Sequence, residues 1–131
     1  MLLLDTDVMV DVLRRYPIAI SWLASLGDEE VILPGFVVME LILGCRNKTE
    51  QTLVEHSLAQ YEVAWPQPEV SQQALVTFSS YHLSDGLGII DALIGQMAVD
   101  FNLPLHTFNQ KHYEVIPDLR CVQPYEKVAE A

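Results

Sequence analysis

Short apolar runs alternate along the chain with longer segments of helical pattern. The apolar runs end at turn residues and predict short strands, although period alone does not distinguish a short strand from a buried helix. The strands are expected at residues 1–5, 31–33, 63–65, 104–107 and 120–123. The helices are expected at residues 8–14, 17–27, 35–45, 49–60, 69–81 and 89–101, with a turn-rich loop at 82–88.

Residues that favour helix starts support several of these elements. Asp7 is placed as an N-cap for the helix over residues 8–14, and Pro17 is placed to open the next one. The stretch GFVVMELILGC is apolar enough for a strand, but the preceding Pro34 and the central Met, Glu and Leu favour a helix.

Strands that alternate with helices indicate an α/β fold with a short, mostly parallel sheet of four to five strands. Such a sheet is covered by helices on both faces, which gives three layers. The 131 residues suit a single domain over 1–131. Ligands of parallel sheets bind beyond the carboxyl ends of the strands, and Asp5 lies at one such end.

The charge balance limits how this protein can meet a nucleic acid. The formal net charge is −11, and the seven Lys and Arg residues form no basic run, which argues against binding by general phosphate neutralisation. Two isolated cysteines favour a reducing compartment, so a cytoplasmic location is expected. No stretch has the pattern of an export signal or a membrane span, so no membrane partner is expected.

Three carboxylates are flanked on both sides by apolar residues: Asp5 in LLLDTDV, Glu40 in VVMELIL and Asp91 in GIIDALI. Buried acids need partners, and few basic residues are available to pair with all three. A shared Mg²⁺ or Mn²⁺ ion would satisfy them, and such clusters cut phosphodiesters. The alternatives are that Asp5 caps a helix, Glu40 lies on a solvated face and Asp91 is favoured by a helix dipole.

At these residues the sequence resembles the PIN-domain family, and within it the VapC-type ribonuclease toxins of VapBC toxin–antitoxin pairs. The matching segments are LLLDTDVMVD, PGFVVMELILG, GIIDALIGQMA and LPLHTFNQKHYEVIPDLRC, which together span essentially the whole chain. The resemblance implies a PIN-like three-layer fold. It also implies a metal-dependent endoribonuclease, a hydrolase that acts as the toxin of a type II toxin–antitoxin system.

Carried over by position, the resemblance implies catalytic and metal-binding roles for three acids. Asp5, Glu40 and Asp91 would bind Mg²⁺ or Mn²⁺ and position the hydrolytic water. Thr6 and Asp7 would line the same pocket, with Asp7 either capping the following helix or partly replacing an acid missing elsewhere.

The C-terminal motif matches the family less completely. Thr107 and Asn109 correspond to a family threonine and asparagine, and the resemblance implies that they contact the phosphate or the acidic cluster. Many relatives carry a fourth acid where this chain has His112, followed by Tyr113 where an aromatic residue is usual. Imidazole is a poor magnesium ligand, so His112 is expected to touch the phosphate, to act as an acid or to be a surface residue without a role.

The resemblance also implies partners. Besides the RNA substrate, a toxin of this type binds a cognate antitoxin. It is expected to form a homodimer or a toxin–antitoxin hetero-oligomer. A hydrophobic groove for an antitoxin peptide, or a dimer face, is expected near Trp22, Leu23 and Leu26 or along residues 36–43. The alternative is that most of these side chains belong to the core.

Two other function classes fit part of the sequence. LLLDTDVMV matches a haloacid-dehalogenase-type phosphatase in which Asp5 is the nucleophile, but Asp85 and Asp91 are too far apart for the late acidic motif of that family. The other class is a non-catalytic PIN-like module for protein binding, suggested by the missing fourth acid and the acidic composition.

Overall fold

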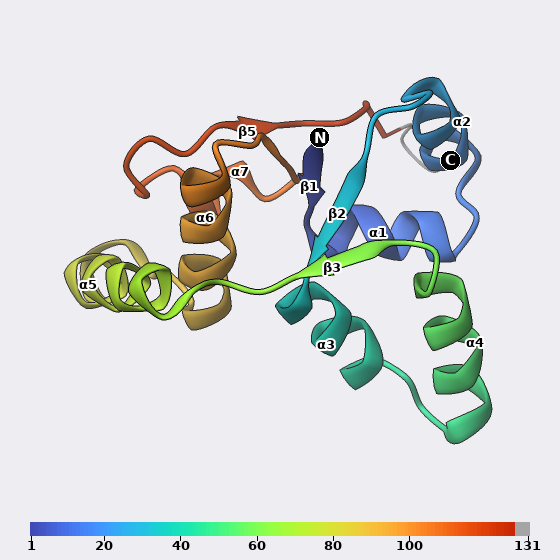
Figure 1. Cartoon of the computed structure of the whole chain (residues 1–131), viewed down its shortest axis with the longest axis horizontal. Helices are drawn as coiled ribbons and strands as arrows, with labels where there is room; N and C mark the ends of the chain where they lie inside the picture. The colour runs from blue at the N-terminus through green and yellow to red at the C-terminus, as the bar shows by residue number, and fades with distance from the viewer. Residues whose placement is uncertain (128–131) are drawn as a thin grey trace.

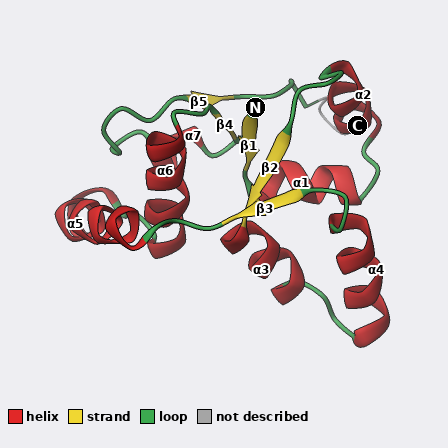
Figure 2. Ribbon diagram, in the orientation of Figure 1, coloured by secondary structure: helices red, strands yellow, loops and turns green. Residues whose placement is uncertain are grey.

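The computed structural model describes residues 1–127, which form a five-stranded sheet flanked by helices (Figures 1 and 2). The strands are β1 (Leu2–Leu4), β2 (Val31–Pro34), β3 (Glu62–Ala64), β4 (Leu105–His106) and β5 (Cys121–Val122). The helices are α1 (Thr6–Leu13), α2 (Pro17–Ser25), α3 (Gly35–Leu43), α4 (Lys48–Leu58), α5 (Pro68–Asp85), α6 (Ile89–Phe101) and α7 (Gln110–Tyr113).

The sheet has the strand order β3-β2-β1-β4-β5, and every pair of neighbours is parallel. This confirms the expected α/β architecture, with a sheet that is entirely parallel within residues 1–127. The chain first builds outward from β1 to β2 and β3, then returns through α5 and α6 to place β4 on the other side of β1. The direction of strand addition therefore reverses between β1 and β4, where open parallel sheets form a crevice at the carboxyl ends of their strands.

The central strand β1 consists of three leucines, which are 3%, 0% and 0% exposed. Leu3 pairs with Ile32 of β2 on one side and Leu105 of β4 on the other. A strand with neighbours on both edges and helices over both faces has no solvated side, which explains its continuous apolar run. In Figure 1 the helices α5 and α6 lie to the left of the strands, and α1, α2 and α4 lie to the right.

The N-cap predicted at Asp7 is wrong. Helix α1 begins at Thr6, and its N-cap is Asp5, whose side chain accepts a hydrogen bond from the Thr6 backbone N–H. Asp5 has the extended backbone of an N-cap residue because it directly continues β1. Asp7 instead lies in the first turn of the helix, where the positive end of the helix dipole favours an acid.

The loop predicted at residues 82–88 is also wrong over most of its length, because α5 continues to Asp85. The helix ends at Gly86, which adopts a left-handed backbone with φ of 69° and donates its N–H to the His82 carbonyl. One glycine in this conformation terminates a helix, so the polar residues before it need not form a loop. The short helix α7 falls in a segment for which the sequence pattern predicted no helix. Within residues 1–127 no helix combines the length and apolar character needed to cross a membrane.

Candidate functional site

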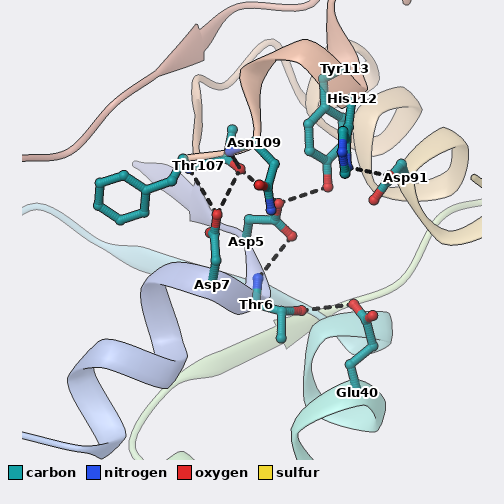
Figure 3. A network of polar contacts seen from close by, with 10 residues as sticks. Asp5, Thr6, Asp7, Glu40, Asp91, Thr107, Asn109, His112 and Tyr113 are labelled. Atoms are coloured by element: carbon teal, nitrogen blue, oxygen red, sulfur yellow. Dashed lines mark hydrogen bonds and ion pairs between the residues drawn. The ribbon is translucent and has the colours of Figure 1, made fainter. Parts of the chain in front are cut away.

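The predicted site residues meet at the carboxyl ends of β1 and β4 (Figure 3). Asp5 follows β1 directly, and Thr107 follows β4. These are the two strands between which the strand order reverses, so the sheet topology itself brings residues about a hundred positions apart into contact. The pattern of strand ends placed only Asp5 at this edge and the family resemblance added Thr107 and Asn109, and the structure brings the two sides into contact.

The Asp5 carboxylate is only 5% exposed and is held by three hydrogen bonds. Its Oδ1 accepts from the Thr6 backbone N–H at 2.8 Å, and its Oδ2 accepts from Thr107 Oγ1 at 2.8 Å and from the Tyr113 hydroxyl at 2.9 Å. Donors of this kind offset the loss of water around a buried carboxylate. The chain therefore supplies the partners that an acid at the end of an apolar strand requires.

Glu40 joins the site through Thr6. It lies in the exposed part of α3, and its Oε1 accepts a hydrogen bond of 2.8 Å from Thr6 Oγ1. Thr6 thus binds two predicted site acids, with its backbone N–H on Asp5 and its hydroxyl on Glu40. This bond ties α3 to the start of α1 at the mouth of the site.

Asp91 occupies the first turn of α6 and is partly buried. Burial raises the pKa of its carboxyl, and the neighbouring charges of Asp5 and Glu40 raise it further, while Tyr113 and His112 lower it. The three acids singled out in the sequence are therefore near enough to interact electrostatically. His112 lies at the rim with its side chain 64% exposed, and its Nδ1 is 3.6 Å from Asp91 Oδ2.

Asp7 and Asn109 lie on the β4 side of the same site. Asp7 Oδ2 accepts from the Phe108 backbone N–H at 2.9 Å and from Thr107 Oγ1 at 3.4 Å, while its Oδ1 is buried without a hydrogen-bond partner. Burial and the adjacent Asp5 raise the pKa of Asp7 to about 6. The Asn109 backbone N–H donates to Thr107 Oγ1, and its side chain points toward Asp5 in Figure 3.

The donor set matches the chemistry of a hard divalent cation, because it consists of carboxylate oxygens whose mutual repulsion such an ion would relieve. The acids are linked through Tyr113 and Thr6 rather than gathered at one point. In the described part of the chain, no three Asp, Glu, His or Cys side chains are close enough to hold an ion together. Metal binding by Asp5, Glu40 and Asp91 therefore stays a prediction.

Tyr113 is the contact residue that the sequence analysis did not single out for a role. It is fully buried, its ring lies beside Gly95 of α6, and its hydroxyl reaches Asp5. The only signal in the sequence that could have indicated this contact is that a buried tyrosine hydroxyl normally needs a hydrogen-bond partner. The sequence did not show which of 18 acids that partner is.

The raised pKa of Asp7 predicts a pH-dependent stability in metal-free protein. The folded state binds the Asp7 proton more tightly than the unfolded state, where the carboxyl has its ordinary pKa of 3.8, so folding stability falls as pH rises from about 4 to about 6. The carboxyl is only half-buried, so solvent screening limits the loss, which we expect to be about 1 kcal/mol. Urea unfolding at pH 4 and pH 7 in EDTA measures it.

The Asp7→Asn variant is the control for this effect. Asparagine keeps an oxygen for the Phe108 N–H but does not titrate, so its stability should change less than that of the wild type between pH 4 and pH 7. Equal changes in the two proteins would contradict the assignment to Asp7.

Comparisons with known proteins place this arrangement in a family. The family model described as the PIN domain matches residues 2–116, while the curated proteins contain no significant match. Among solved structures, a chain of a toxin–antitoxin complex from Klebsiella pneumoniae aligns with a TM-score of 0.77 at 21% identity, covering 97% of this chain and 100% of its own. A chain of DNA-bound VapBC from Salmonella typhimurium gives 0.78 at 22% identity, covering 95% and 100%.

A chain of FitAcB from Neisseria gonorrhoeae aligns with a TM-score of 0.71 at 25% identity, covering 95% of this chain and 98% of its own. In each comparison the shared fold extends over nearly the full length of both aligned chains. The match over residues 2–116 also excludes the haloacid-dehalogenase-type phosphatase as the family of this sequence. The chain belongs to the PIN domain family.

Proposed function

We propose that this protein is a metal-dependent endoribonuclease and the toxin of a type II toxin–antitoxin system. The observation that carries the proposal is the juxtaposition of Asp5, Glu40 and Asp91 at the reversal point of the sheet in a member of the PIN domain family. The PIN domain family is one of nuclease-like hydrolases, one structural neighbour is described as a toxin–antitoxin complex, and others are described as VapBC.

Asp5, Glu40 and Asp91 are the residues that would hold Mg²⁺ or Mn²⁺. When bound, the ion supplies a Lewis acid that activates water and offsets charge on the phosphate. Thr107 holds the Asp5 carboxylate in position, and Thr6 does the same for Glu40.

The rim of the site offers groups for the RNA backbone. A hollow of about 520 Å³ adjoins it, lined by Phe108, Asn109, Gln110, Lys111, His112, Glu114 and Gln123. Asn109, Lys111 and His112 are exposed there and supply hydrogen-bond donors in a protein whose formal net charge is −11. We assign the contact with the phosphate next to the scissile bond to Asn109 and His112, since His112 also lies beside Asp91.

The test uses the protein purified free of any partner and incubated with structured RNA. Cleavage is expected with Mg²⁺ or Mn²⁺ and should stop when EDTA is added in excess, because the carboxylates alone do not activate water. Gel analysis of end-labelled RNA distinguishes internal cuts from trimming at the ends. A non-catalytic module would show no cleavage and no thermal stabilisation by either metal, and that result would overturn the proposal.

An antitoxin is the partner we propose, since one structural neighbour is described as a toxin–antitoxin complex. A groove of about 180 Å³ lies between α1, α2 and the end of α4 and is lined in part by Val12, Leu13, Ile20 and Leu23. Arg15, Ser57, Gln60 and Tyr61 complete the lining, so the groove suits an amphipathic peptide segment. Co-purification with the product of a neighbouring short reading frame, lost on Ile20→Asp, tests this. Homodimer formation also remains a prediction.

A further inference from the structure

The end of α7 and the turn after it, residues 113–119, pack closely on α6 at Gly95. A Cβ atom added at Gly95 would lie 2.3 Å from Ile116 Cδ1 and 3.5 Å from Tyr113 Cδ1. Gly95 is four residues after Asp91, so the two positions share one face of α6. The absence of a side chain at Gly95 therefore allows Ile116 to lie against the helix face that carries Asp91, with the Tyr113 ring in ordinary van der Waals range beside it.

The Tyr113 hydroxyl lies between two of the site acids. It donates to Asp5 Oδ2 at 2.9 Å, and its interaction with Asp91 lowers the pKa of that carboxyl (Figure 3). The hydroxyl is the donor in the bond to Asp5, because an ionised carboxylate only accepts hydrogen bonds. Together with Thr107 Oγ1, it sets the direction of Asp5 Oδ2.

We propose that Tyr113 is a positioning residue of the nuclease site, whose hydroxyl orients Asp5 and links it to Asp91. The claim that Tyr113 strengthens metal binding rests on the proposed function. The claim that its hydroxyl orients Asp5 does not, because it concerns only the contact between these two side chains. A fixed carboxylate needs less reorganisation when it receives a ligand, so the hydroxyl should strengthen metal binding without touching the RNA.

The chain offers a matched pair of tyrosines for the test. Tyr113→Phe keeps the buried ring against Gly95 and removes only the hydroxyl. Tyr125→Phe also removes a hydroxyl that binds a carboxylate, because Tyr125 donates to Asp11 Oδ2 at 2.7 Å outside the site. Tyr125→Phe shows the effect of losing any tyrosine–carboxylate hydrogen bond. A larger effect of Tyr113→Phe is then specific to the bond with Asp5.

The first measurement needs neither metal nor RNA. Urea unfolding in EDTA of wild type, Tyr113→Phe, Asp5→Asn and the double variant gives the coupling between the two side chains. We expect the two substitutions to be non-additive by about tenfold in the unfolding equilibrium constant, because the bond involves a charged acceptor. Additive effects would overturn the orienting contact and leave the nuclease proposal untouched.

The second measurement is Mn²⁺ affinity, followed by electron paramagnetic resonance of the free ion. We expect Tyr113→Phe to weaken binding about tenfold and Tyr125→Phe to leave it unchanged. In RNA cleavage at saturating Mn²⁺, kcat should fall for Tyr113→Phe while KM stays within about twofold. Equal Mn²⁺ affinities for the two variants would overturn the inference, whereas a wild type that neither binds Mn²⁺ nor cleaves RNA would overturn the proposed function and, with it, the metal-binding role.

Discussion

Replacement of Asp5 by asparagine should lower RNA cleavage at least about a hundredfold, a loss typical of removing one charge-stabilising group from a nuclease or hydrolase site. Asparagine has nearly the same shape and can still accept the Thr6 N–H, but it lacks the negative charge that a divalent cation requires. The rate of cleavage of a labelled RNA under saturating Mg²⁺ or Mn²⁺ is the measurement.

Asp91→Asn should behave in the same way, and Asp100→Asn is its matched control. Asp100 is an exposed acid on the same helix, nine residues from Asp91 and so about 13 Å further along the axis. We expect this control to cleave RNA at the wild-type rate. A folded Asp5→Asn or Asp91→Asn variant with normal cleavage would show that the metal centre lies elsewhere.

Leu3→Ala should destabilise the protein by about 2–5 kcal/mol, because it removes a large side chain from the central strand and leaves a cavity. Leu3 is 0% exposed and lies between β2 and β4, so neither edge of the strand can close over the lost volume. Urea unfolding followed by circular dichroism measures the free energy of unfolding.

Leu43→Ala provides the comparison, since Leu43 at the end of α3 is 84% exposed. Its substitution should change stability by less than about 0.5 kcal/mol. A similar loss for both variants would mean that Leu43 is covered in solution, as by a second copy or a partner, or that Leu3 is not at the centre of the core.

The sequence was sufficient to predict the α/β architecture because its signals are local. Three successive leucines in β1 are typical of a strand buried on both faces, and Pro17 marks the start of α2. The predicted boundaries were wrong where the conformation of one residue decides where a helix ends. Gly86 ends α5 by its left-handed backbone, and this extends the helix through polar residues that resemble a loop.

The candidate site was predictable in its residue types but not in its connections. Asp5, Glu40 and Asp91 were conspicuous because each interrupts an apolar stretch. That Asp5 caps α1 while Asp7 binds the Phe108 N–H follows from the path of the chain at the end of β1, which sequence spacing does not specify. His112 could be recognised as a departure from the family pattern, but only the structure places it 3.6 Å from Asp91.

By itself, the sequence determined which segments form the core, that the strands are mostly parallel and that Asp5 is costly to bury, since burial follows from the apolar and polar character of neighbouring residues. Glu40 has equally apolar neighbours but lies exposed on α3, because a helix turns successive residues to different sides. Only the tertiary structure decided which donors meet those acids. Thr107 and Tyr113 lie 102 and 108 positions from Asp5. The return of the chain from β3 to β4, together with the packing of residues 113–119 on Gly95, brings them to its carboxylate. Contacts over such separations depend on strand order and helix packing, which local pattern does not encode.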